Sequence, residues 1–393
     1  MTHPNNPDLL NTVLQLLTTH GTSSLAEGLR LLLNEAMLQE RSAVLQAQPY
    51  ERCEDRLGHA NGFKPKFLAT RVGQIELRIP QVRDGIDFYP SALEKGVRSE
   101  QALLLAMAEM YVQGVSTRKV SKIVEELCGH QVSSTQVSAC AAKLDVELRL
   151  WRERPLGAFP YLVIDARYEK VRHGGVLVDC ATLIAMGIGL DGKRTILGVS
   201  VALSEAEAHW RAFLNSLVER GLHAVQFIVS DAHTGLAAAR RAVFPSIPWQ
   251  RCQFHLQQNA QAYVPRLELR SVVAADIRSI FHGSDLASAQ ARLKERVSHC
   301  EKTAPKLAAW MEQNLPEGFS AFNLPEPHRR RLRTSNAIER VNQELKRRTR
   351  VASLFPNEAS LLRLVTALLC EISNEWATSK VCLNMNLMGP PQT

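Results

Sequence analysis

Two aspartates and a glutamate have the residue type and the setting that could bind divalent metal ions. Asp165 and Asp231 each follow a short apolar run. Each is therefore expected at the C-terminal end of a buried strand, at the edge of a sheet where clefts form. Glu339 lies in the most basic segment of the chain, residues 328–350, where nine lysines and arginines stand against two glutamates. A carboxylate kept among so many cations needs an explanation.

Metal binding is the physical reason for such a trio. Mg²⁺ prefers hard oxygen ligands and needs only a few carboxylates besides water and substrate phosphate oxygens. Two such ions about 4 Å apart can activate a nucleophile and stabilise the leaving oxygen of an in-line phosphoryl displacement. Without metal, the carboxylates would repel each other and any polyanion. The acids thus predict metal-dependent phosphoryl transfer, with Mg²⁺ as the ion and Mn²⁺ as its substitute.

Each acid also has an alternative explanation when it is taken singly. An aspartate after a strand is commonly a turn residue, and Asp231 could cap the helix expected from Thr234. Asn336, followed three residues later by Glu339, matches a capping box in which Glu339 would bond back to the Asn336 amide. In the other arrangement Glu339 shares a helix face with Asn342, beside an apolar stripe that would dock the helix on the sheet.

The elements that would position these acids form a mixed sheet with helices. Apolar runs predict strands over 161–164, 176–190, 194–203 and 224–229, and a short fifth strand over 250–255. Helices are expected over 204–220 and from 234 to about 243. Three strands joined by hairpins, then helix, strand, helix and strand, is the order expected of a ribonuclease-H-like α/β core. Helical residues without strand signals follow the fifth strand and predict an all-helical insertion.

Upstream of this core, the sequence predicts a helical region that could bind DNA. Apolar spacing from Asp8 to Gln48 predicts one or two helices, and the next segment alternates like strands. The cations of that strand-rich segment could follow a phosphate backbone or form a solvated face. Further on, three short helices fit either a helix-turn-helix or a purely structural packing unit. Residues of this unit that could reach DNA are Arg118, Lys119, Ser134, Thr135 and Gln136.

The expected domain organisation follows from these changes in residue pattern along the chain. In order, the segments are N-terminal helices (1–50), a small strand-rich basic segment (51–98), a helix-turn-helix-like region (99–152), the first part of the core (160–255), the all-helical insertion (256–325), the catalytic helix with the end of the core (326–380), and a tail (381–393).

The overall composition agrees with an intracellular protein that binds a polyanion. The formal net charge of +8 permits a nucleic-acid partner. The 8 cysteines are scattered without a CxxC pair, which favours reduced thiols. No signal-peptide pattern and no bilayer-length apolar run is found in the sequence. We therefore expect a cytoplasmic protein that is associated with the nucleoid when it is bound to DNA.

Several spaced motifs resemble the Mutator-type family of insertion-sequence transposases, and together they cover nearly the whole chain. The motifs are Thr70–Gly73, Tyr111–Val120, Tyr161–Arg172, Gly187–Gly198, Ser204–Trp210, Val229–Leu236, Gln250–His255, and Arg333–Arg350 with the following Leu354–Asn357. The resemblance implies a DDE transposase, a metal-dependent polynucleotidyl transferase, in which Asp165, Asp231 and Glu339 match the metal-binding acids.

The family's Cys-x-x-His signature falls on Cys252 and His255. We expect this pair to be structural and to lie near the site, because two ligands do not close a tetrahedral zinc site. Asn336 and Asn342 would position the catalytic helix. The residues expected to bind or orient phosphates are Arg333, Arg340, Lys346, Arg347 and Arg348.

The expected activity is cleavage at the ends of an insertion sequence, followed by attack of the freed 3′-hydroxyl on target DNA. The partners would be the terminal inverted repeats of the element and the target DNA. A homodimer or larger assembly on DNA is expected because two ends must be brought together. The alternatives are a nuclease of the same fold without strand transfer and a DNA-binding regulator that uses the helix-turn-helix alone.

Overall fold

A computed structural model describes residues 7–113, 115–129, 131–350 and 354–387. The chain divides into two units, residues 1–143 and 144–393, and each is described by itself. The last residues of the expected tail, 388–393, lie outside the described part of the chain. Among the described residues, none of the helices combines the length and the apolar character needed to cross a bilayer.

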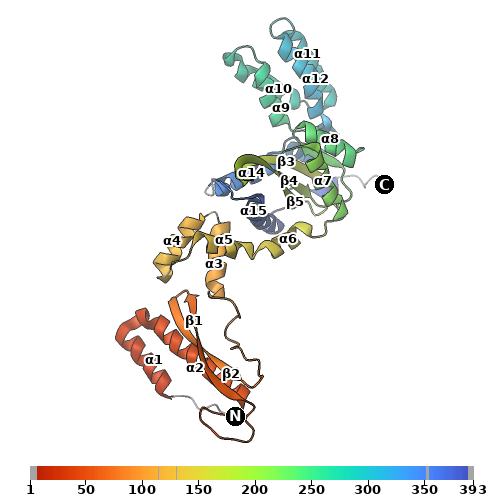
Figure 1. Ribbon diagram of the computed structural model, residues 1–393. Coiled ribbons are helices and arrows are strands. Elements are labelled where there is room, and N and C mark those ends of the chain that lie inside the picture. Colours follow the sequence, from red (N-terminus) through yellow and green to blue (C-terminus); the bar gives the residue numbers. More distant parts are fainter. Residues whose placement is uncertain (1–6, 114, 130, 351–353, 388–393) are drawn as a thin grey trace. The chain divides into compact units, whose positions relative to one another are not determined.

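The first unit begins with two helices and a long β-hairpin (Figure 1). These elements are α1 (Pro7–His20), α2 (Leu25–Leu45), β1 (His59–Thr70) and β2 (Gly73–Arg83). Met37 of α2 packs against Ile75, Leu77 and Ile79, which alternate along one face of β2. The helices predicted from apolar spacing are confirmed. The segment predicted to contain short strands is instead one extended antiparallel pair.

Three short helices complete the first unit. They are α3 (Gln101–Val112), α4 (Thr117–Cys128) and α5 (Ser134–Ala142). The Ser116 hydroxyl caps α4 by accepting a hydrogen bond from the Lys119 amide at 3.4 Å. Ser133 and Gln136 form a capping box at the start of α5. The predicted trihelical unit is therefore present, with a shared apolar core formed by Leu103, Leu104, Met107, Val120, Val124, Cys128, Val137 and Cys140.

The second unit is built around a five-stranded mixed sheet with the order β5-β4-β3-β6-β7. The strands are β3 (Tyr161–His173), β4 (Val176–Ile188), β5 (Arg194–Ala202), β6 (Phe227–Ser230) and β7 (Trp249–Arg251). The first three strands pair antiparallel, while β6 and β7 run parallel to β3. The predicted mixed sheet is thus confirmed.

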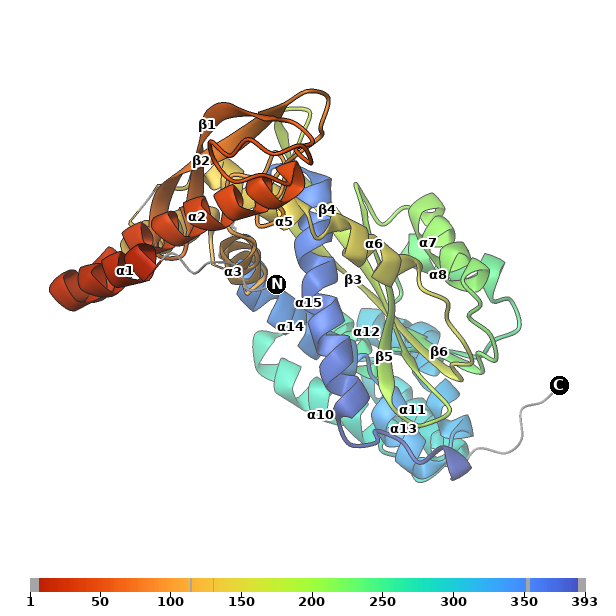
Figure 2. The ribbon, with the colours of Figure 1, turned by 90° about the horizontal axis from the view of Figure 1, so that it is seen from below.

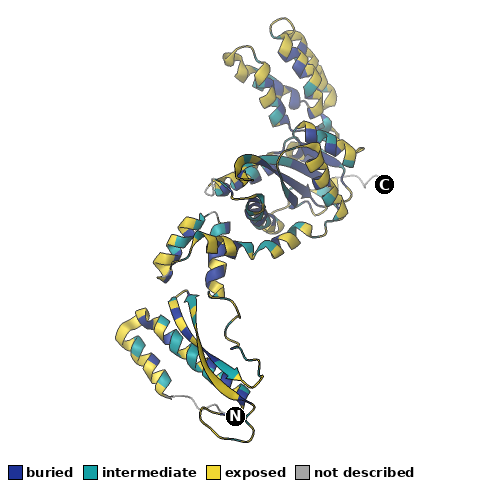
Figure 3. Ribbon diagram, in the orientation of Figure 1, coloured by how far each residue is buried: buried dark blue, intermediate teal, exposed yellow. Residues whose placement is uncertain are grey.

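Helices cover both faces of this sheet (Figure 2). On one face, Leu162 and Ile164 pack with Trp210 of α7 (Glu207–Glu219) and with α8 (Thr234–Val243). Residues of opposite parity in β3 face the other layer, where Tyr161 contacts His328 of α13 (Glu326–Leu332). That layer also contains α14 (Asn336–Thr349) and α15 (Glu358–Thr378), and α6 (Asp145–Glu153) joins it through an ion pair between Arg363 and Asp145. The sheet between the layers is dark with buried residues in Figure 3.

The all-helical insertion between β7 and α13 is observed as predicted. Its helices are α9 (Gln253–Ala260), α10 (Arg270–Phe281), α11 (Leu286–Cys300) and α12 (Pro305–Asn314). They enclose a separate apolar core that includes Trp310 and Phe281. The base of the insertion is fixed to the sheet, because Gln250 of β7 accepts a hydrogen bond from the Ala321 amide at 2.7 Å.

Two predicted strand ends are wrong by four residues or more. Asp165 does not end its strand, because the β3–β4 hairpin continues to pair beyond it as far as His173 and Val176. The fifth strand ends at Arg251 rather than at residue 255. Cys252 donates its amide to Ser230 but accepts from the Leu256 amide, so the chain enters α9 at this point.

Candidate metal centre

The register of two parallel strands sets Asp165 and Asp231 at the same level. Tyr161, Leu162 and Val163 pair with Phe227, Ile228 and Val229. The same register, continued two residues past its last pair, aligns Asp165 with Asp231. Since neighbouring strands lie about 4.8 Å apart, the two carboxylates start from adjacent positions. Asp165 lies inside a long strand, whereas Asp231 directly follows the end of β6.

Helix α14 brings Glu339 to the same place. Its buried side chains Ile338, Val341 and Leu345 dock it, as the apolar stripe predicted. Asn342, one turn after Glu339, donates its Nδ2 hydrogen to Asp165 Oδ2 at 2.7 Å. The helix is therefore attached directly to the strand that carries the first aspartate.

The electrostatics couple all three acids. Burial, the largest cause, acts together with the negative charges of Glu339 and Asp231 to raise the pKa of Asp165 to about 7. A hydrogen bond from the Ala166 amide and the positive charge of His255 act in the opposite direction. Asp165 is thus a carboxyl group whose charge is poorly compensated by the protein alone.

The capping alternatives for these acids are wrong. The residue at the N-cap of α14 is Ser335, and Glu339 accepts from the Ser335 hydroxyl at 2.8 Å instead of folding back onto Asn336. The N-cap of α8 is His233, so Asp231 does not cap that helix. Asp231 accepts from the next amide, that of Ala232, at 2.7 Å.

Cys252 and His255 lie within the site. A sulfur, a ring nitrogen and a carboxylate oxygen from Cys252, His255 and Glu339 all lie within 4.8 Å of one another. His255 Nδ1 is 3.9 Å from Asp231 Oδ2. Hydrogen bonding to Cys252 raises the pKa of His255 to about 9, helped by the negative charges of Asp231 and Asp165 and opposed by burial. The structure thus places this pair beside Glu339 and Asp231.

The predicted phosphate-binding residues differ in what they contact. Arg340 and Lys346 are exposed on α14. Arg333 is half-buried, and its guanidinium lies 3.2 Å from the His282 ring. Arg347 and Arg348 both donate to Glu344, and Arg348 also donates to Glu371 of α15 at 2.6 Å. Arg348 therefore holds α14 against α15, which the sequence did not indicate, whereas Arg347 is exposed and pairs within its own helix.

The upstream residues predicted to contact DNA lie on two helix starts. Arg118 and Lys119 are exposed on the first turn of α4, and Thr135 is exposed beside the half-buried Ser134 on α5. Gln136 is exposed as well, but its side chain accepts from the Ser133 amide at 2.7 Å. The capping box therefore occupies the carbonyl oxygen of Gln136.

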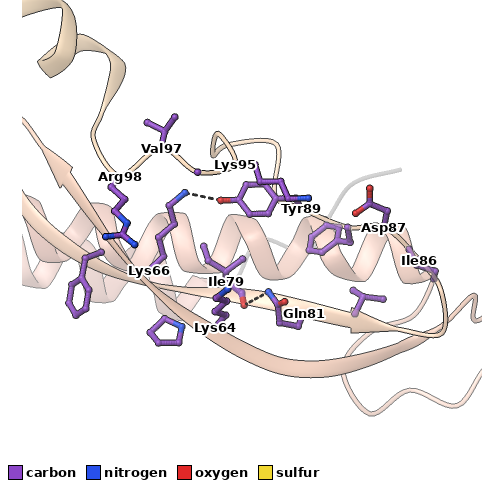
Figure 4. A pocket seen from close by; sticks show the side chains of 15 residues that line it. Lys64, Lys66, Ile79, Gln81, Ile86, Asp87, Tyr89, Lys95, Val97 and Arg98 are labelled. Carbon is purple, nitrogen blue, oxygen red and sulfur yellow. Dashed lines mark hydrogen bonds between the residues drawn. The ribbon is translucent and has the colours of Figure 1, made fainter. Parts of the chain in front are cut away.

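A basic pocket lies beside the hairpin of the first unit (Figure 4). Its volume is about 670 Å³, and its cations, Lys64, Lys66, Lys95 and Arg98, outnumber its one acid, Asp87. Lys66 donates to the Tyr89 hydroxyl at 2.7 Å and to the Glu94 carbonyl at 3.0 Å. At least one cation of the strand-rich segment thus has a structural role.

Sequence reasoning missed two residues that position the site. Arg167 donates from its guanidinium to the Asn342 carbonyl and pairs with Glu169. Its position two residues after Asp165 in a strand, on the same face, was an available signal. Ser335 donates to Glu339 four residues later, and this i, i+4 spacing at a helix start was also an available signal.

Comparison with known proteins agrees with the resemblance read from the motifs. A family model described as "Transposase, Mutator family" matches residues 6–379. The chain is 58% identical over 372 residues to the transposase for insertion sequence element IS406 of Burkholderia multivorans, covering 94% of this chain and 96% of that protein. It is 39% identical over 351 residues to the transposase for IS256 in transposon Tn4001 of Staphylococcus aureus, covering 88% and 89%.

A solved structure of a simian T-cell lymphotropic virus intasome in complex with PP2A regulatory subunit B56 gamma also matches. Its TM-score is 0.17 at 9% identity, covering 52% of this chain and 66% of that chain. A likeness this weak carries no argument about the fold.

Proposed function

The chain belongs to the Mutator family of transposases, and on this basis we propose that it is a DNA transposase with a ribonuclease-H-like core. It cleaves DNA at the ends of an insertion sequence and joins the freed 3′-hydroxyl to target DNA. The observation that carries the proposal is the convergence of Asp165, Asp231 and Glu339 from two neighbouring strands and a docked helix. Three antiparallel strands followed by two parallel ones support the proposed core.

The donor set fits Mg²⁺ or Mn²⁺. Asp165, Asp231 and Glu339 offer hard carboxylate oxygens, which these ions prefer. Burial chiefly, and the charges of Glu339 and Asp231 in addition, raise the pKa of Asp165, and a divalent cation would stabilise its charged form. The buried Oδ1 of Asn342 has no hydrogen-bond partner in the described part of the chain, although the Nδ2 of the same amide is bonded to Asp165. When bound, the ions supply activation of the attacking hydroxyl or water and stabilisation of the leaving 3′-oxygen.

The chain's own residues position the reacting groups. Asn342 holds the Asp165 carboxylate, and Ser335 holds that of Glu339. Arg167 fixes α14 against β3 through the Asn342 carbonyl. Such supporting contacts keep ligand carboxylates in place without the cost of reorganising them during the reaction.

DNA phosphates would be bound by cations beside the acids. Arg340 and Lys346 are exposed on the catalytic helix, and Arg333 precedes it. Arg347 is also exposed beside them, whereas Arg348 contributes through the position of the helix, because Glu344 and Glu371 occupy its guanidinium group. Bringing two element ends together requires more than one copy of the chain, so a homodimer or larger assembly on DNA is part of the proposal.

The test is cleavage of DNA that carries candidate element ends, with Mg²⁺ and with EDTA. Cleavage only with Mg²⁺, together with joined products in a plasmid integration assay, is the expected result. Cleavage without any joined product would leave a nuclease of the same fold. Cleavage that persists in EDTA, or a Glu339→Gln variant with every function intact, would overturn the proposed mechanism.

A further inference from the structure

Soft donor atoms lie directly beside the three acids. Cys252 Sγ, a ring nitrogen of His255 and a Glu339 carboxylate oxygen lie within 4.8 Å of one another. Thiolate, imidazole and carboxylate together are the ligands that Zn²⁺ takes, whereas Mg²⁺ takes oxygen alone. The proposed transfer of phosphoryl groups uses neither the sulfur nor the imidazole.

The folding of two helix starts creates this cluster. Cys252 is the N-cap of α9 and His255 lies three residues later, so both side chains share one side of the first turn. The Gln253 amide donates to the Arg333 carbonyl at 3.0 Å, which ties the start of α9 to the residues just before α14. Glu339 then reaches the cluster from the first turn of α14.

One buried residue supports two of the donors at once. The Ser335 amide donates to Cys252 Sγ at 3.4 Å, and the Ser335 hydroxyl donates to Glu339 Oε1 at 2.8 Å. Hydrogen bonds of this kind orient metal ligands in protein sites. Cys252 itself is completely buried, while His255 is partly exposed to solvent.

The geometry is close to that of a zinc site. Zn–S of about 2.3 Å and Zn–O of about 2.1 Å give a tetrahedral S···O edge of about 3.6 Å. Cys252 Sγ and Glu339 Oε1 are 3.8 Å apart. A small movement of the histidine ring would complete three of four tetrahedral positions.

We propose that Cys252, His255 and Glu339 bind a thiophilic divalent cation, Zn²⁺ in particular, in a site with one open position. Glu339 belongs both to this site and to the acid trio. A Zn²⁺ ion bound by Cys252, His255 and Glu339 therefore takes the Glu339 carboxylate away from the trio. The consequence, which rests on the proposed function, is that Zn²⁺ inhibits Mg²⁺-dependent DNA cleavage. The competing explanation is that the Cys252 thiol merely donates a hydrogen bond to Glu339, which a serine would reproduce.

Titration of the full-length protein with Co²⁺ tests the site without any DNA. Thiolate ligation gives a sulfur-to-cobalt charge-transfer band in the near ultraviolet, expected in the wild type and absent from Cys252→Ser. Cys300→Ser, which removes another of the 8 cysteines in the neighbouring helical insertion, should keep the band. A wild type without the band, or a Cys252→Ser variant that retains it, overturns the proposal.

Zn²⁺ affinity and inhibition provide the second measurement. Loss of a supporting hydrogen bond costs metal sites about 10- to 100-fold in affinity, so loss of the ligand itself in Cys252→Ser should cost at least about 100-fold. Zn²⁺ should inhibit cleavage by the wild type and not by Cys252→Ser, whereas equal Zn²⁺ affinities for the two proteins refute the site. A cobalt band without any Mg²⁺-dependent cleavage would refute the proposed function and leave the metal site standing.

A second variant tests the site in case Cys252→Ser does not fold. His255→Gln keeps the sulfur, so the charge-transfer band should remain while Zn²⁺ affinity falls. Tryptophan fluorescence and thermal melts report whether each variant is folded. If Cys252→Ser does not fold, unchanged Zn²⁺ affinity in His255→Gln overturns the proposal.

Discussion

Replacing Asp165 with asparagine should stabilise the second unit at alkaline pH when no divalent metal is present. The folded protein raises the pKa of this carboxyl from 3.8 to about 7, chiefly because the group is buried. The folded state therefore binds a proton that the unfolded state has already lost between these two values. The free energy of unfolding must fall as the pH rises from about 4 to 7.

The size of the effect follows from the shift. About three pH units at about 1.4 kcal/mol each give about 4 kcal/mol as the upper figure for the cost of ionised Asp165 at pH 8. An asparagine at this position cannot ionise and still offers an oxygen to Asn342, so the variant escapes this cost. We expect Asp165→Asn to exceed the wild type by several kcal/mol at pH 8 and to approach it at pH 4.

Guanidinium unfolding in EDTA, followed by tryptophan fluorescence, measures the difference. The 5 tryptophans all lie within residues 144–393, so the signal reports on the second unit alone. Asp179→Asn, which removes an exposed carboxylate from the neighbouring strand, is the matched control and should change stability by less than about 0.5 kcal/mol at either pH. A difference between Asp165→Asn and wild type that is the same at both pH values would refute the reasoning.

Divalent metal extends the same experiment. Mg²⁺ at 100 times its dissociation constant should stabilise the wild type at pH 8 by about 2.7 kcal/mol. Asp165→Asn should gain much less, because one of the proposed ligands is lost.

Three further predictions concern the acid on the helix, the basic residues and a close glycine contact. Glu339→Gln should lower Mg²⁺-dependent cleavage by about 10³-fold while gel-shift binding of DNA persists; lost binding would point to a structural role. Lys346→Met should weaken DNA binding and reduce its salt dependence by about one charge without changing stability. Arg348→Met should instead destabilise the protein, because the ion pair that joins α14 to Glu371 of α15 is lost; the reverse pattern contradicts both assignments. Gly192→Ala should lower the melting temperature far more than Gly175→Ala. Both glycines have positive φ, but only at Gly192 would a Cβ atom lie 1.9 Å from the Leu383 carbonyl oxygen. Equal decreases in melting temperature would show that backbone strain alone causes the loss.

The sequence predicted those parts of the fold that local patterns specify. The apolar runs of the sheet and the helix from Thr234 to Val243 are found where the residues indicated. Asp165 was placed at a strand end because polar residues follow it, but the antiparallel partner pairs with those polar residues as far as His173. Strand length in a hairpin is decided by the partner strand, which a local pattern does not reveal.

The same limit explains what was missed in the site. Cys252 and His255 were separated from a third donor by sequence distance, since Glu339 lies 87 positions after Cys252 and reaches it only through the docking of α14. The sequence therefore showed two neighbouring donors, and the fold adds Glu339 as the third. Ser335 hydrogen-bonds to Cys252, 83 positions away, and this contact was hidden for the same reason, whereas its bond to Glu339, four residues on, is local.

The basic segment around Glu339 divides its charge between two tasks. Its excess of cations indicated a polyanion, yet Arg348 uses its guanidinium to bind Glu344 and Glu371, the latter 23 positions further on. That pairing holds α14 against α15, and α14 in turn fixes Asn342 on Asp165. The arginine thus supports the acid trio indirectly, through the position of the helix. Charge counted along the chain is an upper bound on the charge offered to DNA, because folding neutralises part of it to build the site that the DNA would meet.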